Sequence, residues 1–201
     1  MAQPRTSRRQ WGWHRLDERW ARRLVADAGI SPGDLVLDVG AGDGSLTAPL
    51  VEAGARVIAV EAHPGRAAIL RERFARDDVV VVRADATDLR LPRRPFRVVS
   101  NLPYATTSEV MRRLVHPGSR LRTAHVILQE QAARRWAGPD APGAARWQRG
   151  IVPSLGPPVP RRAFEPPPQV GSRVLILDAT NSRTTTAPSP GGSRDGRPRR
   201  S

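Results

Sequence analysis

Short apolar runs rich in β-branched residues alternate along the chain with segments of helical periodicity. Runs of strand length occupy residues 35–39, 56–60, 79–82, 96–100, 125–128 and 174–177, and helical patterns occupy residues 45–53, 64–75 and 107–115. Buried strands that alternate with helices are typical of a parallel sheet with helices on its faces. The pattern therefore predicts the α/β class, with a mainly parallel, doubly wound sheet.

Three segments interrupt this alternation. Residues 153–168 are rich in proline, which lacks a backbone donor, so we expect a proline-broken connection before the last strand. Residues 1–22 are basic and contain tryptophan, and we expect an arm that runs into a helix. Residues 179–201 have almost no apolar side chains to repay their ordering entropy, which predicts a disordered basic tail. One folded domain, residues 23–178, is expected between these ends.

The charge of the chain favours an anionic partner. Its 201 residues include 33 Lys+Arg and 19 Asp+Glu, a formal net charge of +14. Every basic residue is arginine, and codon usage of a GC-rich genome would explain arginine in place of lysine, but not the excess of positive charge. Nucleic acid is the partner that fits best.

Composition also argues against other classes of protein. There is no cysteine, and the four histidines have no ligand-like spacing, so no metal is expected. The N-terminus lacks the apolar stretch of a secretory signal, and no run of about 18 apolar residues suggests a membrane span. These features are compatible with a protein of the cytoplasm that does not enter membranes.

A glycine-rich loop, residues 38–44, follows the first predicted strand and opens the first helix. Its G-x-G-x-G spacing differs from the G-x-G-x-x-G of nicotinamide dinucleotide sites, and Asp38 and Asp43 flank the glycines. Two carboxylates repel a pyrophosphate but favour a ligand that carries an ammonium and a sulfonium. The loop therefore favours S-adenosylmethionine, with Gly40, Ala41 and Gly42 as its contacts.

Acidic side chains also follow the next two strands. Glu61 is placed to accept hydrogen bonds from both ribose hydroxyls of this cofactor, and Asp85 to accept one from its adenine amine. The residues that follow them, Ala62 and Ala86, are also expected to contact the cofactor. A carboxylate at a strand end is more often a solvated or capping residue, and Asp38 has a loop-holding role as its alternative. Three of them at successive strand ends nevertheless indicate one ligand site.

The segment Asn101-Leu102-Pro103-Tyr104 follows the fourth strand at the same predicted edge, and Asn101 is also a candidate contact of the cofactor. It matches the (N/D)-P-P-(Y/F) type of tetrapeptide, with leucine second, which characterises methyltransferases that act on planar amino groups. The Asn101 side-chain oxygen and the Leu102 carbonyl can accept both hydrogens of an adenine amine, while Pro103 keeps Leu102 extended and offers no N–H. Tyr104 can stack on the base, a contact worth ~1–3 kcal/mol. An ordinary Asn-Pro turn is the alternative.

Together these motifs resemble those of the ribosomal-RNA adenine N6-methyltransferases, which include the KsgA-like and Erm enzymes. Residues 164–172 are similar to the family's F-x-P-x-P-x-V-x-S segment. The resemblance implies a Rossmann-like class I methyltransferase fold with a seven-stranded sheet. It also implies that Phe164 is a second residue stacking on the target base, with a core phenylalanine as the alternative.

Two departures from the family pattern refine this expectation. The Q-N-F-L-type motif is absent, and Gly12-Trp13-His14-Arg15 stands in its place, with Trp13 and His14 as candidate cofactor contacts. The helical C-terminal domain that usually follows the F-x-P-x-P-x-V-x-S segment is missing. Both departures resemble short actinobacterial Erm enzymes.

This closer resemblance implies a monomer that methylates an adenine in the peptidyl-transferase loop of 23S ribosomal RNA. Such methylation confers resistance to macrolides, lincosamides and streptogramin B. A KsgA-like dimethyltransferase of small-subunit ribosomal RNA is the main alternative. A non-catalytic RNA-binding protein on the same fold is another, and methylation of DNA or of a small-molecule amine stands behind both.

Overall fold

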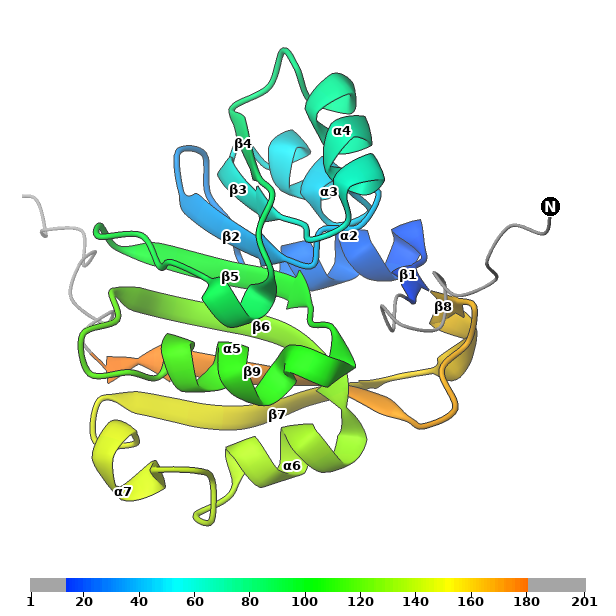
Figure 1. Ribbon diagram of the computed structural model, residues 1–201. Helices are drawn as coiled ribbons and strands as arrows, with labels where there is room; N and C mark the ends of the chain where they lie inside the picture. The colour runs from blue at the N-terminus through cyan, green and yellow to red at the C-terminus, as the bar shows by residue number, and fades with distance from the viewer. Residues whose placement is uncertain (1–13, 181–201) are drawn as a thin grey trace, which may run out of the picture.

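The computed structural model describes residues 14–180, and the chain is built around one twisted sheet (Figure 1). Its strands are β2 (Leu35–Val39), β3 (Arg56–Val60), β4 (Val79–Val82), β5 (Phe96–Asn101), β6 (Leu121–Gln129), β7 (Ile151–Val159) and β9 (Ser172–Ala179). They lie in the order β4-β3-β2-β5-β6-β9-β7. The first five are parallel, and β9 is antiparallel to both of its neighbours. The predicted seven-stranded, mainly parallel sheet is confirmed.

Helices cover both faces of the sheet, so the predicted double winding is also confirmed (Figure 1). They are α2 (Glu18–Asp27), α3 (Thr47–Glu52), α4 (Pro64–Arg73), α5 (Thr107–Leu114), α6 (Glu130–Ala137) and α7 (Ala144–Trp147). Helices α2, α3 and α4 contribute to one buried cluster, and α5, α6 and α7 to the other. None of the helices between residues 14 and 180 has the length and apolarity to cross a membrane.

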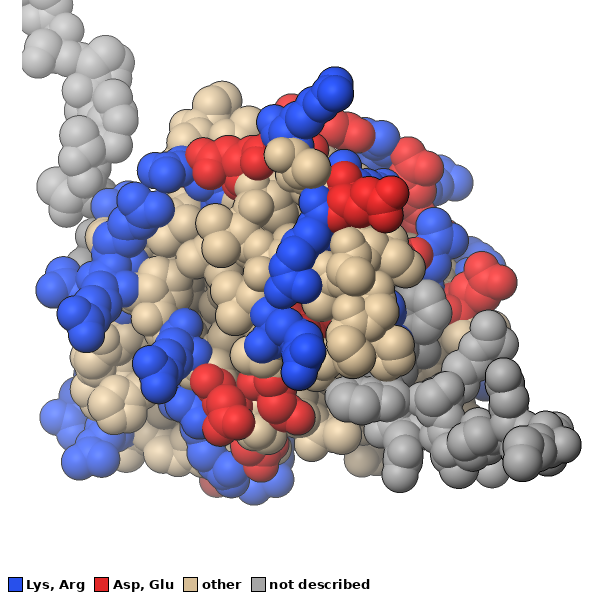
Figure 2. All heavy atoms as spheres, turned by 45° about the horizontal axis from the view of Figure 1, so that its top comes forward, with Lys and Arg blue, Asp and Glu red and all other residues tan. Residues whose placement is uncertain are grey.

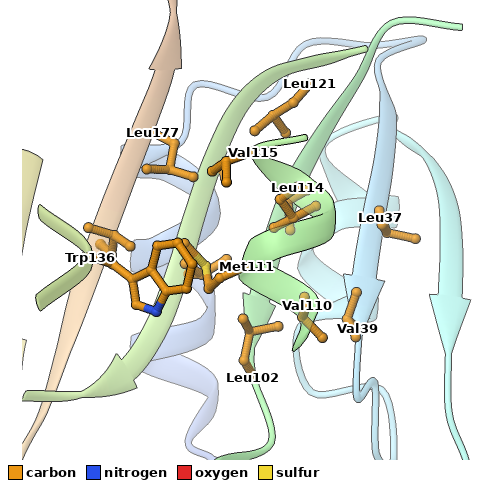
Figure 3. Packing of buried hydrophobic residues seen from close by; sticks show 14 of the residues in the cluster. Leu37, Val39, Leu102, Val110, Met111, Leu114, Val115, Leu121, Trp136 and Leu177 are labelled. Atoms are coloured by element: carbon orange, nitrogen blue, oxygen red, sulfur yellow. The ribbon is translucent and has the colours of Figure 1, made fainter. Parts of the chain in front are cut away.

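Apolar side chains fill the space between the sheet and each helical layer. Trp136 of α6 and Met111 of α5 point toward one another in the larger cluster (Figure 3), and they are 1% and 0% exposed. On the other face, Leu24 of α2 and Leu50 of α3 pack over β2. The two layers hold the strands rigidly, so the loops at the strand ends start from fixed positions.

The expectation of a proline-broken connection over residues 153–168 is wrong for its first half. Pro153 and Pro158 lie inside β7, which pairs with β9 along most of its length. Strand β7 is at the edge of the sheet, where a residue without an N–H loses no ladder partner on the open side. Its register shifts between Leu155 and Pro158, as in a β-bulge. The prolines therefore mark an edge strand.

The segment before α2 pairs with a segment from the far end of the chain. Strands β1 (Arg15–Leu16) and β8 (Phe164–Glu165) form a separate antiparallel pair. The Asp17 N–H donates to the Ala163 carbonyl at 2.8 Å, and the Asp17 carboxylate caps α2. The boundary expected at residue 22 falls inside α2, so residues 14–22 pack with the domain. The expectations for residues 1–13 and 181–201 lie outside the described residues.

Candidate functional site

A cavity of about 320 Å³ opens where the parallel strands β2, β3, β4 and β5 end. Its size is within the range of small-molecule sites, ~300–1,000 Å³. Most of the residues predicted for the site line it: His14, Asp38, Gly40, Ala41, Glu61, Ala62, Asp85, Ala86, Asn101, Leu102, Pro103 and Tyr104. Residues from five separated segments thus meet in one place.

Some predicted residues lie elsewhere. Phe164 is 3% exposed and belongs to the buried cluster beneath β1 and β8, so its side chain is in the core and not at the cavity. This burial favours the alternative of a core phenylalanine, and contact of Phe164 with a base stays a prediction. Gly42 is not among the residues that line the cavity, and Trp13 is outside the described residues.

The cavity is also lined by residues that were not predicted for the site: Arg15, Ser45, Leu46, Val60, Arg66, Ala84, Ala105 and Thr106. Across residues 14–180, no three histidine or acidic side chains are grouped as a metal site would require.

Glu61 connects the glycine loop to the end of β3. It is 3% exposed, and its carboxylate accepts from the Gly42 N–H at 2.9 Å, the His63 N–H at 2.7 Å and the Arg66 guanidinium at 2.9 Å. A carboxylate has about four acceptor positions, so three are already used. Glu61 therefore holds the loop and has limited capacity left for a ligand hydroxyl.

Asp38 is a buried acid at the end of β2. It is 1% exposed, and its carboxyl accepts from the Thr47 hydroxyl at 2.9 Å. Burial raises the pKa of Asp38 to about 7, and the nearby Glu61 charge acts in the same direction. The bond to Thr47 joins the strand to the start of α3, which is the loop-holding role.

Asp85 begins the turn η1 (Ala86–Asp88) after β4. Its Oδ1 accepts from both the N–H and the hydroxyl of Thr87, each at 2.8 Å. Both bonds fall on one oxygen and fix the carboxylate at the cavity wall. The second oxygen is thus placed to accept from a ligand.

Gly40 and Pro103 bring the glycine loop into contact with the tetrapeptide. Gly40 has a φ of +77°, and a Cβ added there would lie 2.8 Å from Pro103 Cγ. Only glycine combines this backbone conformation with so close an approach. The loops after β2 and β5, which are neighbours in the sheet, therefore touch at the cavity.

The Asn101 side chain has one partner and one free acceptor. Its Nδ2 donates to the His14 carbonyl at 2.9 Å, which fixes the orientation of the amide. Its Oδ1 is buried and has no hydrogen-bond partner within residues 14–180. An unsatisfied buried acceptor costs ~1–3 kcal/mol. Asn101 lines the cavity, so this acceptor without a partner belongs to a residue of its wall.

Tyr104 is held at two points. Its hydroxyl shares a hydrogen bond with the Ser172 hydroxyl at 2.8 Å, and its ring lies 5.5 Å from the His14 ring. The His14 Nδ1 donates to the Pro166 carbonyl at 2.7 Å, since a carbonyl oxygen only accepts. Burial raises the pKa of Tyr104, so it stays a neutral phenol. Ser172 ends the F-x-P-x-P-x-V-x-S segment, and sequence reasoning did not assign it to the site.

Comparison with known proteins identifies the family. A family model described as "Ribosomal RNA adenine dimethylase" matches residues 6–187. The chain belongs to this family. A probable ribosomal RNA small subunit methyltransferase A of Methanosarcina mazei is 34% identical over 170 residues, and an rRNA methyltransferase of Streptomyces thermotolerans is 35% identical over 171.

These relatives are longer than the matched region. Each alignment covers 81% of this chain, but only 61% of the Methanosarcina protein and 56% of the Streptomyces protein. The crystal structure of the 23S rRNA methyltransferase ErmE superimposes with a TM-score of 0.73 at 28% identity, covering 83% of this chain and 69% of that one. The fold is thus that of a Rossmann-like methyltransferase.

S-adenosylmethionine is the methyl donor of the dimethylase family. The residues at the cavity fit it, because Asp85 and the unpartnered Asn101 oxygen are acceptors and the wall includes the acids Asp38 and Glu61.

We predict that Gly40→Ala destabilises the protein more than Gly29→Ala does. Both glycines have positive φ, but a Cβ at Gly29 would meet nothing within 4 Å, whereas at Gly40 it would collide with Pro103. Strain of this kind costs ~1–3 kcal/mol, and the collision adds to it at Gly40. Urea unfolding of both variants provides the measurement. Equal losses would show that the contact with Pro103 is loose.

We also predict that stability falls as pH rises from about 4 to about 7, in part because of Asp38. The folded-state pKa is raised to about 7, whereas the unfolded carboxyl titrates near its ordinary value. Within this window the folded state holds more protons, so raising the pH favours unfolding. Asp38→Asn keeps an acceptor for Thr47 and is expected to reduce the slope of unfolding free energy against pH. An unchanged slope would assign the effect to another group.

Proposed function

We propose that the chain transfers a methyl group from S-adenosylmethionine to N6 of an adenine in ribosomal RNA. The observation that carries this proposal is the buried, unpartnered Asn101 Oδ1 at the cavity, beside the contact of Gly40 with Pro103. When bound, the cofactor supplies an electrophilic methyl on its sulfonium. The residues of the chain then have to present the amine nitrogen to it.

Asn101 and Leu102 orient the amine. The lone pair of an adenine amine is delocalised into the ring, so the nitrogen attacks poorly unless its hydrogens are drawn aside. Asn101 Oδ1 accepts one hydrogen, and the Leu102 carbonyl accepts the other. The Leu102 N–H donates to Ile127 of β6 at 3.2 Å, which anchors this backbone to the sheet. Positioning of this kind can lower the activation free energy by ~7–11 kcal/mol.

Tyr104 provides the ring face for the extruded base. Ser172 and His14 restrain its hydroxyl and its ring, so the phenol is oriented before the base arrives. Preorganised groups lose less entropy on binding. With Phe164 in the core, Tyr104 is the aromatic residue of the tetrapeptide that carries base stacking in this proposal.

The surface charge suits an RNA substrate. Arginine side chains spread over the face in Figure 2, with acidic side chains in smaller groups between them. A protein with a formal net charge of +14 attracts a phosphate backbone without reading its sequence. Activity in the cytoplasm, by a monomer, is part of the proposal.

Within ribosomal RNA, we propose the adenine of the peptidyl-transferase loop of 23S RNA, with macrolide, lincosamide and streptogramin B resistance as the consequence. The likeness to ErmE and the segment Gly12-Trp13-His14-Arg15 support this choice. The relative from Methanosarcina mazei supports the alternative, methylation of small-subunit RNA. Expression in a macrolide-sensitive bacterium, followed by reverse-transcriptase mapping of both RNAs, distinguishes the two.

Asn101→Ala is predicted to lower the methylation rate by about 100-fold or more, because it removes a fixed acceptor from the reacting nitrogen. Binding of S-adenosylhomocysteine is predicted to change little. Methyl incorporation into ribosomal RNA and calorimetry measure the two quantities. A protein that only binds RNA would show no methyl transfer in either form, which would refute the proposal.

Phe164→Leu and Tyr104→Leu are predicted to act in opposite ways. Phe164→Leu keeps an apolar side chain in the core, so it lowers the unfolding free energy by ~1 kcal/mol and leaves methylation within a few-fold. Tyr104→Leu removes a base-stacking face worth ~1–3 kcal/mol and lowers methylation by about 5- to 150-fold. Unfolding curves and methylation rates of both variants test this. A Phe164→Leu enzyme that is stable but inactive would return Phe164 to the base site.

A further inference from the structure

A second cavity of about 320 Å³ lies at the other end of the parallel strands, where β2, β3 and β5 begin. It shares no lining residue with the cavity that contains Asn101. We call it the amino-end cavity. Ligands of parallel α/β sheets usually bind at the carboxyl ends of the strands, so methyl transfer gives no reason for a cavity at this end.

The wall of the amino-end cavity is strongly basic. Asp34 is its one acidic residue, and it stands against four arginines, an excess of three positive charges. Like charges around one cavity repel each other, and a bound anion relieves this repulsion. The arginines are Arg56, Arg94, Arg97 and Arg122.

Two of the four arginines are held in place by the fold. Arg97 donates through Nη1 to the Asp34 carboxylate at 2.7 Å and through Nε to the Thr123 hydroxyl at 2.9 Å. Arg56 pairs with Asp78, which lies outside the wall, at 2.7 Å. With Asp78 counted as well, an excess of two positive charges remains. The wall therefore stays positive after its ion pairs are formed.

The chemistry of the wall suits a phosphate. Arg94 lies in the loop before β5 and Arg122 in β6, and both are exposed. Guanidinium groups bind phosphate oxygens through charged, often bidentate hydrogen bonds. Phe96 is the aromatic residue of the wall, but it is 1% exposed, so a base finds no ring to stack on. A cavity that offers charge without a stacking face favours a backbone phosphate over a nucleobase.

Strand β5 connects the two cavities. Arg97 near its start lines the amino-end cavity, and Asn101 at its end lines the other. The four residues between these positions correspond to about 13 Å of strand. The parallel strands begin at the left of Figure 1, and basic side chains gather on the same side in Figure 2. An RNA with its adenine at Asn101 thus reaches the amino-end cavity only with a part remote from that adenine.

We propose that the amino-end cavity binds a backbone phosphate of the ribosomal RNA, remote from the adenine that is methylated. This inference rests on the proposed function, which supplies the RNA substrate. A phosphate contact fixes the position of the RNA without reading its sequence. Together with the base at Asn101, it would hold the substrate at two separated points.

Arg94→Gln combined with Arg122→Gln tests the proposal. Affinity for an RNA hairpin of unrelated sequence is expected to fall about 10- to 100-fold, the loss of charged hydrogen bonds. The slope of log affinity against log salt is expected to decrease by about one to two, because fewer phosphates are neutralised. Fluorescence anisotropy at several salt concentrations measures both quantities. Unchanged binding of S-adenosylhomocysteine would report an intact fold.

Methylation kinetics of the same variant provide a second readout. The amino-end cavity is remote from Asn101, so the KM for ribosomal RNA is expected to rise by about 10-fold or more while kcat stays within about twofold. A fall in hairpin affinity with an unchanged KM would separate the cavity from the substrate and overturn the proposal.

Arg71→Gln combined with Arg149→Gln is the matched control. Both side chains are exposed, and they donate to backbone carbonyls, Arg71 to Val81 and Arg149 to Ala145. Neither lines a cavity described above, so the control removes the same charge elsewhere. We expect it to weaken the hairpin by less than about threefold, through the general attraction of the protein for RNA.

Two further results would overturn the inference. Equal losses of RNA affinity in the two double variants would mean that the amino-end cavity acts only through the total charge. Inorganic pyrophosphate is the probe for the other: a heat of binding that disappears in the Arg94 and Arg122 variant, with RNA affinity unchanged, would assign the cavity to a free polyphosphate. If the unaltered chain transfers no methyl group, the proposed function fails, whereas the hairpin affinities still decide whether the cavity binds RNA.

Discussion

The approach of Gly40 to Pro103 is the constraint on which the site depends. Strands β2 and β5 are neighbours in the sheet, and the loops that follow them leave it at the same edge. The glycine loop and the tetrapeptide therefore have to pack closely against each other. A residue with a side chain at position 40 would push Pro103 away. Because glycine allows this contact, Asn101 and Leu102 lie in the wall of the cavity. Backbone packing thus places the glycine loop and the tetrapeptide at one cavity.

The tetrapeptide is also held from the opposite side. The segment before α2 pairs with residues 164–165 and supplies the His14 carbonyl for Asn101, and Ser172 at the start of β9 supplies a hydroxyl for Tyr104. The F-x-P-x-P-x-V-x-S segment thus acts on the site mainly as a support. Phe164 stabilises this segment by packing in the buried cluster, where removal of its ring would leave a cavity. Support of this kind matters because an acceptor that can rotate loses the preorganisation it provides.

Local patterns predicted much of the fold, and long-range contacts account for what they missed. The apolar runs predicted the parallel strands. Most of the glycine loop, Glu61, Asp85 and the tetrapeptide line the cavity, because each lies at the end of a parallel strand or within a few residues of it. The prolines of β7 fit both a broken connection and an edge strand, and only the pairing of β7 with β9 decides between the two. Ser172 lies 68 positions from Tyr104, and Pro166 lies 152 from His14. No local sequence pattern predicts contacts between residues so far apart in the chain.

The structure also changes the reason why the loop favours a sulfonium over a pyrophosphate. Charge counting treated Asp38 and Asp43 as two free negative charges, but burial raises the pKa of Asp38 to about 7 and Arg15 pairs with Asp43. A second argument against a pyrophosphate is that three N–H groups of the loop already have partners within the protein. Those of Gly40 and Ala41 donate to the Val60 carbonyl, and that of Gly42 donates to Glu61. A phosphate cradle needs such donors pointing at the ligand. Here they are turned inward, and the cavity offers acceptors in their place.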